Sequence, residues 1–274
     1  MMMNIKNIEA TQHLSHLKQL YMRHTTAPLD GMWLCGLVPL ARHYGLYEAS
    51  ELAGFCCVNE DGYLLQFLMD PKYQQRSSEL FASIVHGDLS AGEIKGAFAS
   101  TAEPEYLSLC ADHYSSITVN ALMYQLADTP WSLQSRVVNT PLAMSAVEAP
   151  QLAEAVEFAM AAIGAPPEWL TGYYANLIDR HELFGLWEEG RLIAAGESRG
   201  YDDYQTDYAD VGVIVAASER SRGLATRVLK HLIAMNEEKS LSSICSTEAG
   251  NIAAQKAITR AGFLARNRIL QFND

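Results

Sequence analysis

The chain has 274 residues and a formal net charge of −12, with the excess of acidic residues shared by its two halves. This length suits two α/β domains of about 135 residues each, and acidic halves argue against nucleic acid or an anionic membrane as the main partner. The five cysteines lack metal-ligand spacing and no segment has 18 uninterrupted apolar residues. We therefore expect a soluble, cytoplasmic protein without a metal site or a membrane span.

The N-terminal half predicts a β-hairpin followed by alternating helices and strands. Residues 53–58 and 63–69 are apolar runs joined by Asn59-Glu60-Asp61-Gly62, which is the pattern of a hairpin. A helix is expected to follow Asp70-Pro71 and to run through Val85, because proline is favoured in a first helical turn. A strand at 94–99, a helix from Pro104 to about 114 and a strand at 117–126 complete this half.

Between the halves, Pro130 and Pro141 interrupt the periodic sequence and predict a linker over about residues 128–141. The elements expected after it are a strand at 142–147, helices at 151–163 and 167–180, hairpin strands at 183–187 and 192–197, a Val-rich strand at 210–215, a helix of about four turns from 224, a strand at 243–247, a helix after 251 and a strand at 265–272.

The most informative segment joins the Val-rich strand to the helix that follows it, through Arg220-Ser221-Arg222-Gly223. A helix N-terminus offers unpaired backbone N–H groups and the positive end of the helix dipole, which together can hold a phosphate. Gly223 lacks a Cβ at the point where a diphosphate would approach the backbone. The sequence therefore predicts an anion site at the start of this helix.

The pattern Arg220-x-x-Gly223-x-Ala225, followed by Asn251-x-x-Ala254 and the closing Gly262-Phe263, resembles the acetyl-CoA-binding core of the GNAT superfamily of N-acetyltransferases. The resemblance covers about residues 140–274 and is strongest over 208–263. It implies an α/β (α+β) fold with a mixed, mostly antiparallel central sheet flanked by helices, in which one strand splays from its neighbour and pairs its backbone with the pantetheine arm. The residues that it assigns to the co-substrate acetyl-CoA are Val213, Ile214, Val215, Arg220, Ser221, Arg222, Gly223, Leu224, Ala225, Thr226, Asn251 and Ala254.

The elements of the N-terminal half repeat the later part of this fold, so we interpret the chain as two tandem GNAT-like domains. Residues 1–135 form a degenerate copy without a CoA loop, and residues 136–274 form the acetyltransferase domain. The positions that match the loop are Gln74-x-x-Ser77-x-Glu79, where added side chains and a carboxylate oppose a diphosphate. An unrelated α/β cap is the alternative for the first half.

Acetyl transfer to an amine requires a polarised thioester, a base for the amine and a proton source for the thiolate. Asp210 is the candidate base, near the position of the family's glutamate, and Glu197 at the end of the preceding strand is the alternative. The tyrosine that serves as the acid in the family corresponds here to Ile258, which has no proton to donate. The substitutes that the sequence leaves open are Tyr173, Tyr174, Tyr208 and Ser246.

The resemblance thus predicts an acetyl-CoA-dependent N-acetyltransferase in which a primary amine attacks the thioester directly. The acceptor would be an amine on a small molecule or a peptide. The alternative is a non-catalytic acyl-CoA-binding sensor or regulatory protein, which the isoleucine at 258 and the degenerate first copy favour. A homodimer is possible.

Overall fold

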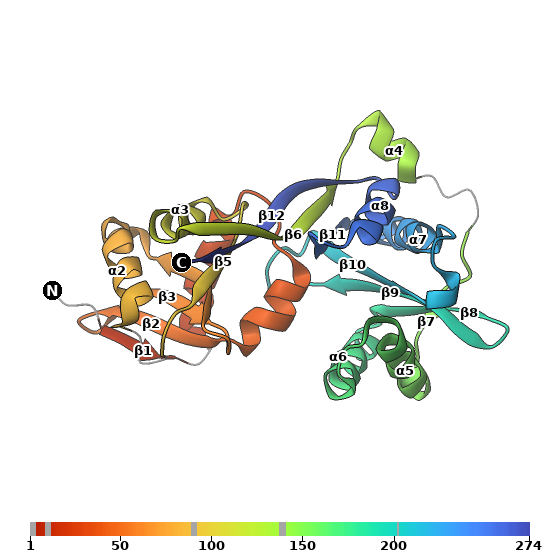
Figure 1. Cartoon of the computed structure of the whole chain (residues 1–274), viewed down its shortest axis with the longest axis horizontal. Helices are drawn as coiled ribbons and strands as arrows, with labels where there is room; N and C mark the ends of the chain where they lie inside the picture. The colour runs from red at the N-terminus through yellow and green to blue at the C-terminus, as the bar shows by residue number, and fades with distance from the viewer. Residues whose placement is uncertain (1–3, 9–11, 89–91, 137–140, 202) are drawn as a thin grey trace. The chain divides into compact units, whose positions relative to one another are not determined.

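The computed structural model describes residues 4–8, 12–88, 92–136, 141–201 and 203–274, and the chain divides into two compact units (Figure 1). The first unit comprises Met1–Met123 together with Asn267–Asp274, and the second comprises Tyr124–Arg266. The sequence predicted one boundary, between residues 135 and 136. In the structure the chain crosses between the units twice, because Asn267–Asp274 belongs to the first unit.

The first unit contains all the elements expected in the N-terminal half, and before them β1, α1, two short helical turns and β2, which were not predicted. Its elements are β1 (Asn4–Asn7), α1 (Gln12–His24), β2 (Arg42–Glu48), β3 (Glu51–Val58), β4 (Tyr63–Met69), α2 (Ser77–Ser83), β5 (Gly96–Ser100), α3 (Pro104–His113), most of β6 (Ser116–Leu126), the end of β12 (Phe263–Asn273) and the short helical turns η1 (Trp33–Leu37), η2 (Val38–Leu40), η3 (Pro71–Arg76) and η4 (Ile84–Asp88). The strand order β1-β2-β3-β4-β5-β12 is antiparallel except between β4 and β5.

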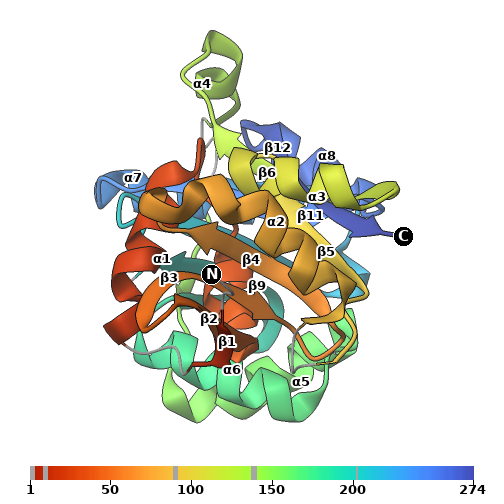
Figure 2. The ribbon, with the colours of Figure 1, turned by 90° about the vertical axis from the view of Figure 1, so that its left-hand side faces the viewer.

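Two hydrophobic cores cover the faces of these strands. Phe81 of α2 and Tyr106 of α3 belong to one core, and Leu17 and Tyr21 of α1 belong to the other; Figure 2 views this unit with its helices on the two sides of the strands. The C-terminal strand β12 reaches the first core through the fully buried Phe272. Its close approach requires Gly96 of β5, where a Cβ atom would lie 2.2 Å from the carbonyl oxygen of Phe272.

The second unit follows the predicted order of elements. They are α4 (Pro130–Arg136), β7 (Ser145–Ala146), α5 (Leu152–Ile163), α6 (Pro167–Asp179), β8 (Leu183–Glu188), β9 (Arg191–Gly200), β10 (Tyr208–Val215), α7 (Leu224–Glu238), β11 (Ser242–Glu248), α8 (Ile252–Arg260) and the short helical turns η5 (Ala149–Gln151) and η6 (Ala217–Glu219). The order β7-β8-β9-β10-β11 is antiparallel except between β10 and β11. The expected strand at 142–147 is reduced to the two residues of β7.

Part of the predicted linker forms the short helix α4. Pro130 occupies the first position of α4, where its missing N–H costs nothing. The Ser132 hydroxyl donates to the carbonyl oxygen of Gly262 at 2.6 Å, and Arg136 pairs with Glu237 of α7 at 2.8 Å. Residues 137–140 of the predicted linker lie outside the described residues.

Helices cover both faces of the sheet in the second unit (Figure 1). On one face, α5 and α6 form a core with β8 and β9 that includes the fully buried Tyr174 and the side chain of Ile214 from β10. On the other face, Val228 and Leu232 of α7 approach Gly196 of β9. Among the described residues, no helix is long and apolar enough to cross a membrane.

Candidate functional site

The neighbouring strands β10 and β11 run parallel but pair over a short length only. The paired positions are Tyr208 with Ser242, Ala209 with Ser243 and Asp210 with Ile244. From Val211 to Val215, β10 keeps its pairing with β9 and, within the part of the chain that the structure describes, has no strand partner on the β11 side. The predicted splay is therefore present, and Val213, Ile214 and Val215 lie along its open edge.

The loop after β10 brings backbone N–H groups to the start of α7. Ser221 and Gly223 have positive φ angles of 62° and 76°. Glycine adopts such an angle without strain. Gly223 is the N-cap of α7 and gives it no side-chain hydrogen bond, and the amides of Leu224, Ala225 and Thr226 have no acceptor within the helix. A Cβ atom at Gly223 would meet nothing within 4 Å, so a ligand can approach the backbone at this residue.

The two arginines of the loop make contacts within the protein. Arg220 donates from Nε to the carbonyl oxygen of Val215 at 3.2 Å and from Nη2 to that of Ala162 at 2.7 Å. Its guanidinium thus braces the loop against the end of β10 and the end of α5. Arg222 is exposed and pairs with the buried carboxylate of Glu219, so its charge is partly compensated.

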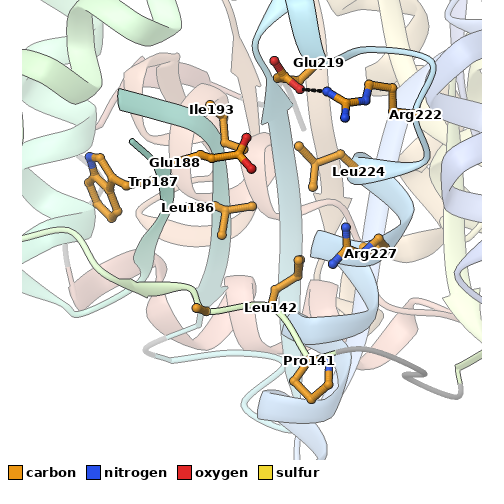
Figure 3. A pocket seen from close by; sticks show the side chains of 11 residues that line it. Pro141, Leu142, Leu186, Trp187, Glu188, Ile193, Glu219, Arg222, Leu224 and Arg227 are labelled. Carbon is orange, nitrogen blue, oxygen red and sulfur yellow. Dashed lines mark hydrogen bonds and ion pairs between the residues drawn. The ribbon is translucent and has the colours of Figure 1, made fainter. Parts of the chain in front are cut away.

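A pocket of about 300 Å³ lies beside this loop, with Arg222 and Glu219 at one end (Figure 3). Its wall combines apolar side chains with the charged groups of Glu188 and Arg227. The lining residues come from β8, β9, the loop, α7 and the segment before β7, and they are Pro141, Leu142, Ala143, Leu186, Trp187, Glu188, Ile193, Glu219, Arg222, Leu224 and Arg227. The pocket has space for part of a ligand held at the start of α7.

The second motif of the resemblance lies next to the first. Asn251 caps α8 by accepting a hydrogen bond from the amide of Ala254 at 3.1 Å. The Thr226 hydroxyl, in the first turn of α7, donates to the carbonyl oxygen of Ala257 in α8 at 3.2 Å. The first turn of α7 therefore contacts the second half of α8.

Both candidate bases lie on the face of the sheet that α6 covers, and a residue that the sequence analysis missed joins them. Arg199 of β9 pairs with Asp210 at 3.0 Å and with Glu197 at 3.2 Å. Asp210 is fully buried, and Glu197 is 7% exposed. A Cβ atom at Gly212 would lie 3.3 Å from Glu197 Oε2, so this carboxylate lies over β10 just beyond its last pairing with β11.

A tyrosine of α6 completes this cluster. The Tyr173 hydroxyl donates to Glu197 Oε2 at 2.6 Å and accepts from Arg199 Nη1 at 2.8 Å. Burial, followed by the charge of Glu197, raises the pKa of Tyr173 well above its usual 10. Its ring stacks on the half-exposed Trp169, with centroids 4.8 Å apart and planes 13° from parallel.

The remaining positions singled out in the sequence are Tyr208 and Ile258. Tyr208 starts β10, and the alternation of a strand places its side chain on the same face as Asp210. Ile258, at the position of the family's tyrosine, is 5% exposed within α8. Among the described residues, no group of three or more His, Cys, Asp or Glu side chains could hold a metal ion.

The first unit has a similar pair of parallel strands, but side chains fill the space beside it. Strands β4 and β5 pair only at Tyr63 with Gly96 and at Leu64 with Ala97. The buried Tyr106 of α3 donates to the carbonyl oxygen of Leu64 at 3.0 Å, and the pocket beside it has about 20 Å³, the space of about one water molecule.

The matching loop of the first unit is also closed. Asp70 accepts the amide of Lys72 at 3.0 Å at the start of η3. Glu79 pairs with Arg76 at 3.5 Å. The carboxylate of Asp70 thus accepts a hydrogen bond from the amide of Lys72, which could otherwise bind an anion.

Comparisons with known families agree with this arrangement. Residues 10–127 match the family described as "Acetyltransferase (GNAT) domain", and residues 152–263 match "Acetyltransferase (GNAT) family". No curated protein gives a significant match.

Solved structures resemble the whole chain. An "Acetyltransferase from GNAT family" of Colwellia psychrerythraea is 49% identical, with a TM-score of 0.92 over 98% of this chain and 99% of that one. A "Tandem GNAT protein from the clavulanic acid biosynthesis pathway" is 13% identical, with a TM-score of 0.66 over 98% of both chains. A "GCN5-related N-Acetyltransferase" of Sphaerobacter thermophilus is 12% identical, with a TM-score of 0.60 over 98% of this chain and 94% of that one. The last two are similar in fold alone.

Proposed function

Because the chain belongs to the GNAT acetyltransferase family and consists of two such domains in tandem, we propose that it transfers an acetyl group from acetyl-CoA to a primary amine. Its second unit binds one acetyl-CoA per chain. The acceptor is a small molecule or a peptide with an amino group, and the attack on the thioester is direct. We keep the prediction that the protein acts in the cytoplasm.

The observation that carries this proposal is the separation of β10 from β11 after Asp210, next to open amides at the start of α7. The open edge of β10 offers backbone N–H and C=O groups to the amide-containing pantetheine arm. The amides of residues 221–226 suit the diphosphate. A backbone N–H of β10 beyond Asp210 would polarise the thioester carbonyl, which needs no particular side chain.

The base is one of the two carboxylates that share Arg199. Glu197 lies over Gly212, beside the open edge of β10, whereas Asp210 is at the last paired position and fully buried. These positions favour Glu197 as the group that takes the proton of the amine, with Asp210 holding Arg199 in place. Asp210, the candidate base from the sequence analysis, is therefore the alternative to Glu197 in this proposal.

The test combines binding and turnover. Calorimetric titration with acetyl-CoA is expected to give one site per chain, and thiol release is expected with at least one member of a panel of primary amines. Binding without thiol release would favour an acyl-CoA sensor. Two equivalent sites would contradict the assignment of the first unit as a closed copy.

A further inference from the structure

The proposed reaction needs a proton for the departing thiolate, and the usual position for its donor holds Ile258. The cluster under α6 contains one hydroxyl that is already part of a hydrogen-bond chain. Arg199 Nη1 donates to the Tyr173 oxygen at 2.8 Å, and that oxygen donates its proton to Glu197 Oε2 at 2.6 Å. Arg199 therefore fixes the direction of the chain, because its N–H group occupies the acceptor side of the hydroxyl.

The other hydroxyls that the sequence left open have weaker positions. Tyr174 is fully buried in the core between α5, α6 and the sheet, and its hydroxyl has no hydrogen-bond partner among the described residues. Tyr208 begins β10 and Ser246 lies in β11, and within the described residues neither hydroxyl is seen to contact Glu197 or Asp210. Tyr173 alone among these four links its hydroxyl to a candidate base, and that base lies over Gly212 at the start of the splay.

We propose that Tyr173 passes the proton of the acceptor amine from Glu197 to the sulfur of CoA, with Arg199 as its positioning residue; this rests on the function proposed above. The amine nitrogen forms a bond to the acetyl carbon and gives one proton to Glu197. The carbon–sulfur bond then breaks, and the electron pair stays on sulfur. Tyr173 gives its hydroxyl proton to the sulfur and takes the proton of Glu197, so that amide and thiol are the products and both side chains return to their starting state.

Burial explains why the tyrosine acts as a relay and not as an isolated acid. Burial, and then the charge of Glu197, raises the pKa of Tyr173, so the hydroxyl is protonated at neutral pH. A thiol has a pKa near 8.5, well below that of the buried tyrosine, so a tyrosinate left in this buried position would be unfavourable. Simultaneous transfer from Glu197 avoids the tyrosinate, because the negative charge never rests on Tyr173.

The kinetic test compares Tyr173→Phe with Tyr174→Phe, a matched control that removes the neighbouring hydroxyl from the same helix. Thiol release is measured with acetyl-CoA and an amine that the unaltered protein acetylates. Tyr173→Phe is expected to lower kcat by about 10² or more and to leave the KM for acetyl-CoA within about threefold. Tyr174→Phe is expected to retain the full rate. Equal losses in both variants, or full activity of Tyr173→Phe, would overturn the relay.

A second measurement needs no turnover. Carbon-13 labelling of the tyrosine rings, with the Tyr173 signal assigned from its absence in Tyr173→Phe, follows ionisation by NMR in the ligand-free protein. Tyr173 is expected to ionise well above pH 10 and to ionise at a lower pH in Glu197→Gln, because the charge that raises its pKa is gone. An unchanged titration would remove the coupling on which the relay depends. A protein that binds acetyl-CoA but releases no thiol with any amine would instead refute the proposed function, before any variant is compared.

Discussion

Glu103 gives the sharpest stability prediction, because its carboxyl group is buried in the first unit and its hydrogen-bond partners are a hydroxyl and a backbone amide. Its side chain accepts hydrogen bonds from the Tyr21 hydroxyl and from the amide of Ser100, and the residue is 5% exposed. Burial raises its pKa from 4.5 to about 7, against the smaller opposing effect of the two hydrogen bonds. We predict that the free energy of unfolding of Glu103→Gln increases relative to that of the parent as the pH rises.

The sign follows from the protons bound in each state. Between pH 4.5 and about 7, folded Glu103 keeps a proton that the unfolded chain has lost, so the free energy of unfolding falls as the pH rises through this window. At 1.36 kcal/mol per pH unit, the whole window corresponds to about 3 kcal/mol. Glutamine stays neutral throughout, so the variant does not show this decrease in the free energy of unfolding. A lost hydrogen bond would change the free energy by about 1 kcal/mol at every pH, which leaves the slope untouched.

The assay is urea-induced unfolding from pH 4.5 to 8, followed by the fluorescence of Trp33. Trp33 is buried in the first unit, and the other three tryptophans are replaced by phenylalanine so that it reports alone. The free energy of unfolding of Glu103→Gln minus that of the parent should rise by about 3 kcal/mol across the range. Glu103 is the N-cap of α3, and Glu105, half exposed in the first turn of that helix, is the control, so Glu105→Gln should follow the parent. A constant difference for Glu103→Gln would refute the reasoning.

Three further predictions concern the open site and the C-terminal strand. Gly223→Glu should weaken acetyl-CoA by about 10² or more in calorimetry, because it adds a like charge among the amides; Gly223→Ala controls for backbone strain at φ 76°, and normal binding by a folded Gly223→Glu would contradict the anion site. Glu197→Gln should lower kcat by about 10² to 10⁴ and by more than Asp210→Asn does; the reverse order would assign the base to Asp210. Phe272→Ala should destabilise the first unit by about 3 to 5 kcal/mol in urea unfolding, and a result below about 1 kcal/mol would mean that β12 contributes little.

Local patterns were enough to predict the loop and the elements around it. The strand before the loop, the glycine with positive φ at residue 223 and the amphipathic helix after it are set by residues within about 25 positions of each other. The turn of the β8–β9 hairpin was predictable for the same reason, since Glu189 and Gly190 both adopt positive φ. The helix that Pro130 begins was not predictable, because a proline that interrupts one helix is also favoured in the first turn of another.

Features that depend on register or on distant segments were not predictable. Arg199 faces Asp210 because β9 and β10 pair in one particular register, and a shift by one residue would turn both side chains to the other face. The contact of Tyr173 with Glu197 depends on how α6 packs on the sheet. The pairing of Ile269 with Ser100 joins residues far apart in the chain, and only the missing side chain of Gly96 hints at it.

The two units show that a short parallel pairing is not sufficient to make a binding site. Both contain parallel strands that pair at two or three positions only. In the first unit Tyr106 of α3 donates to the carbonyl oxygen of Leu64, so this backbone group of β4 has a partner within the protein. In the second unit, Gly212 has no side chain, and Glu197 lies over this part of β10. Tyr173 on α6 is the proton source that we propose in place of a tyrosine on α8, where this chain has Ile258 at the position usual in the family.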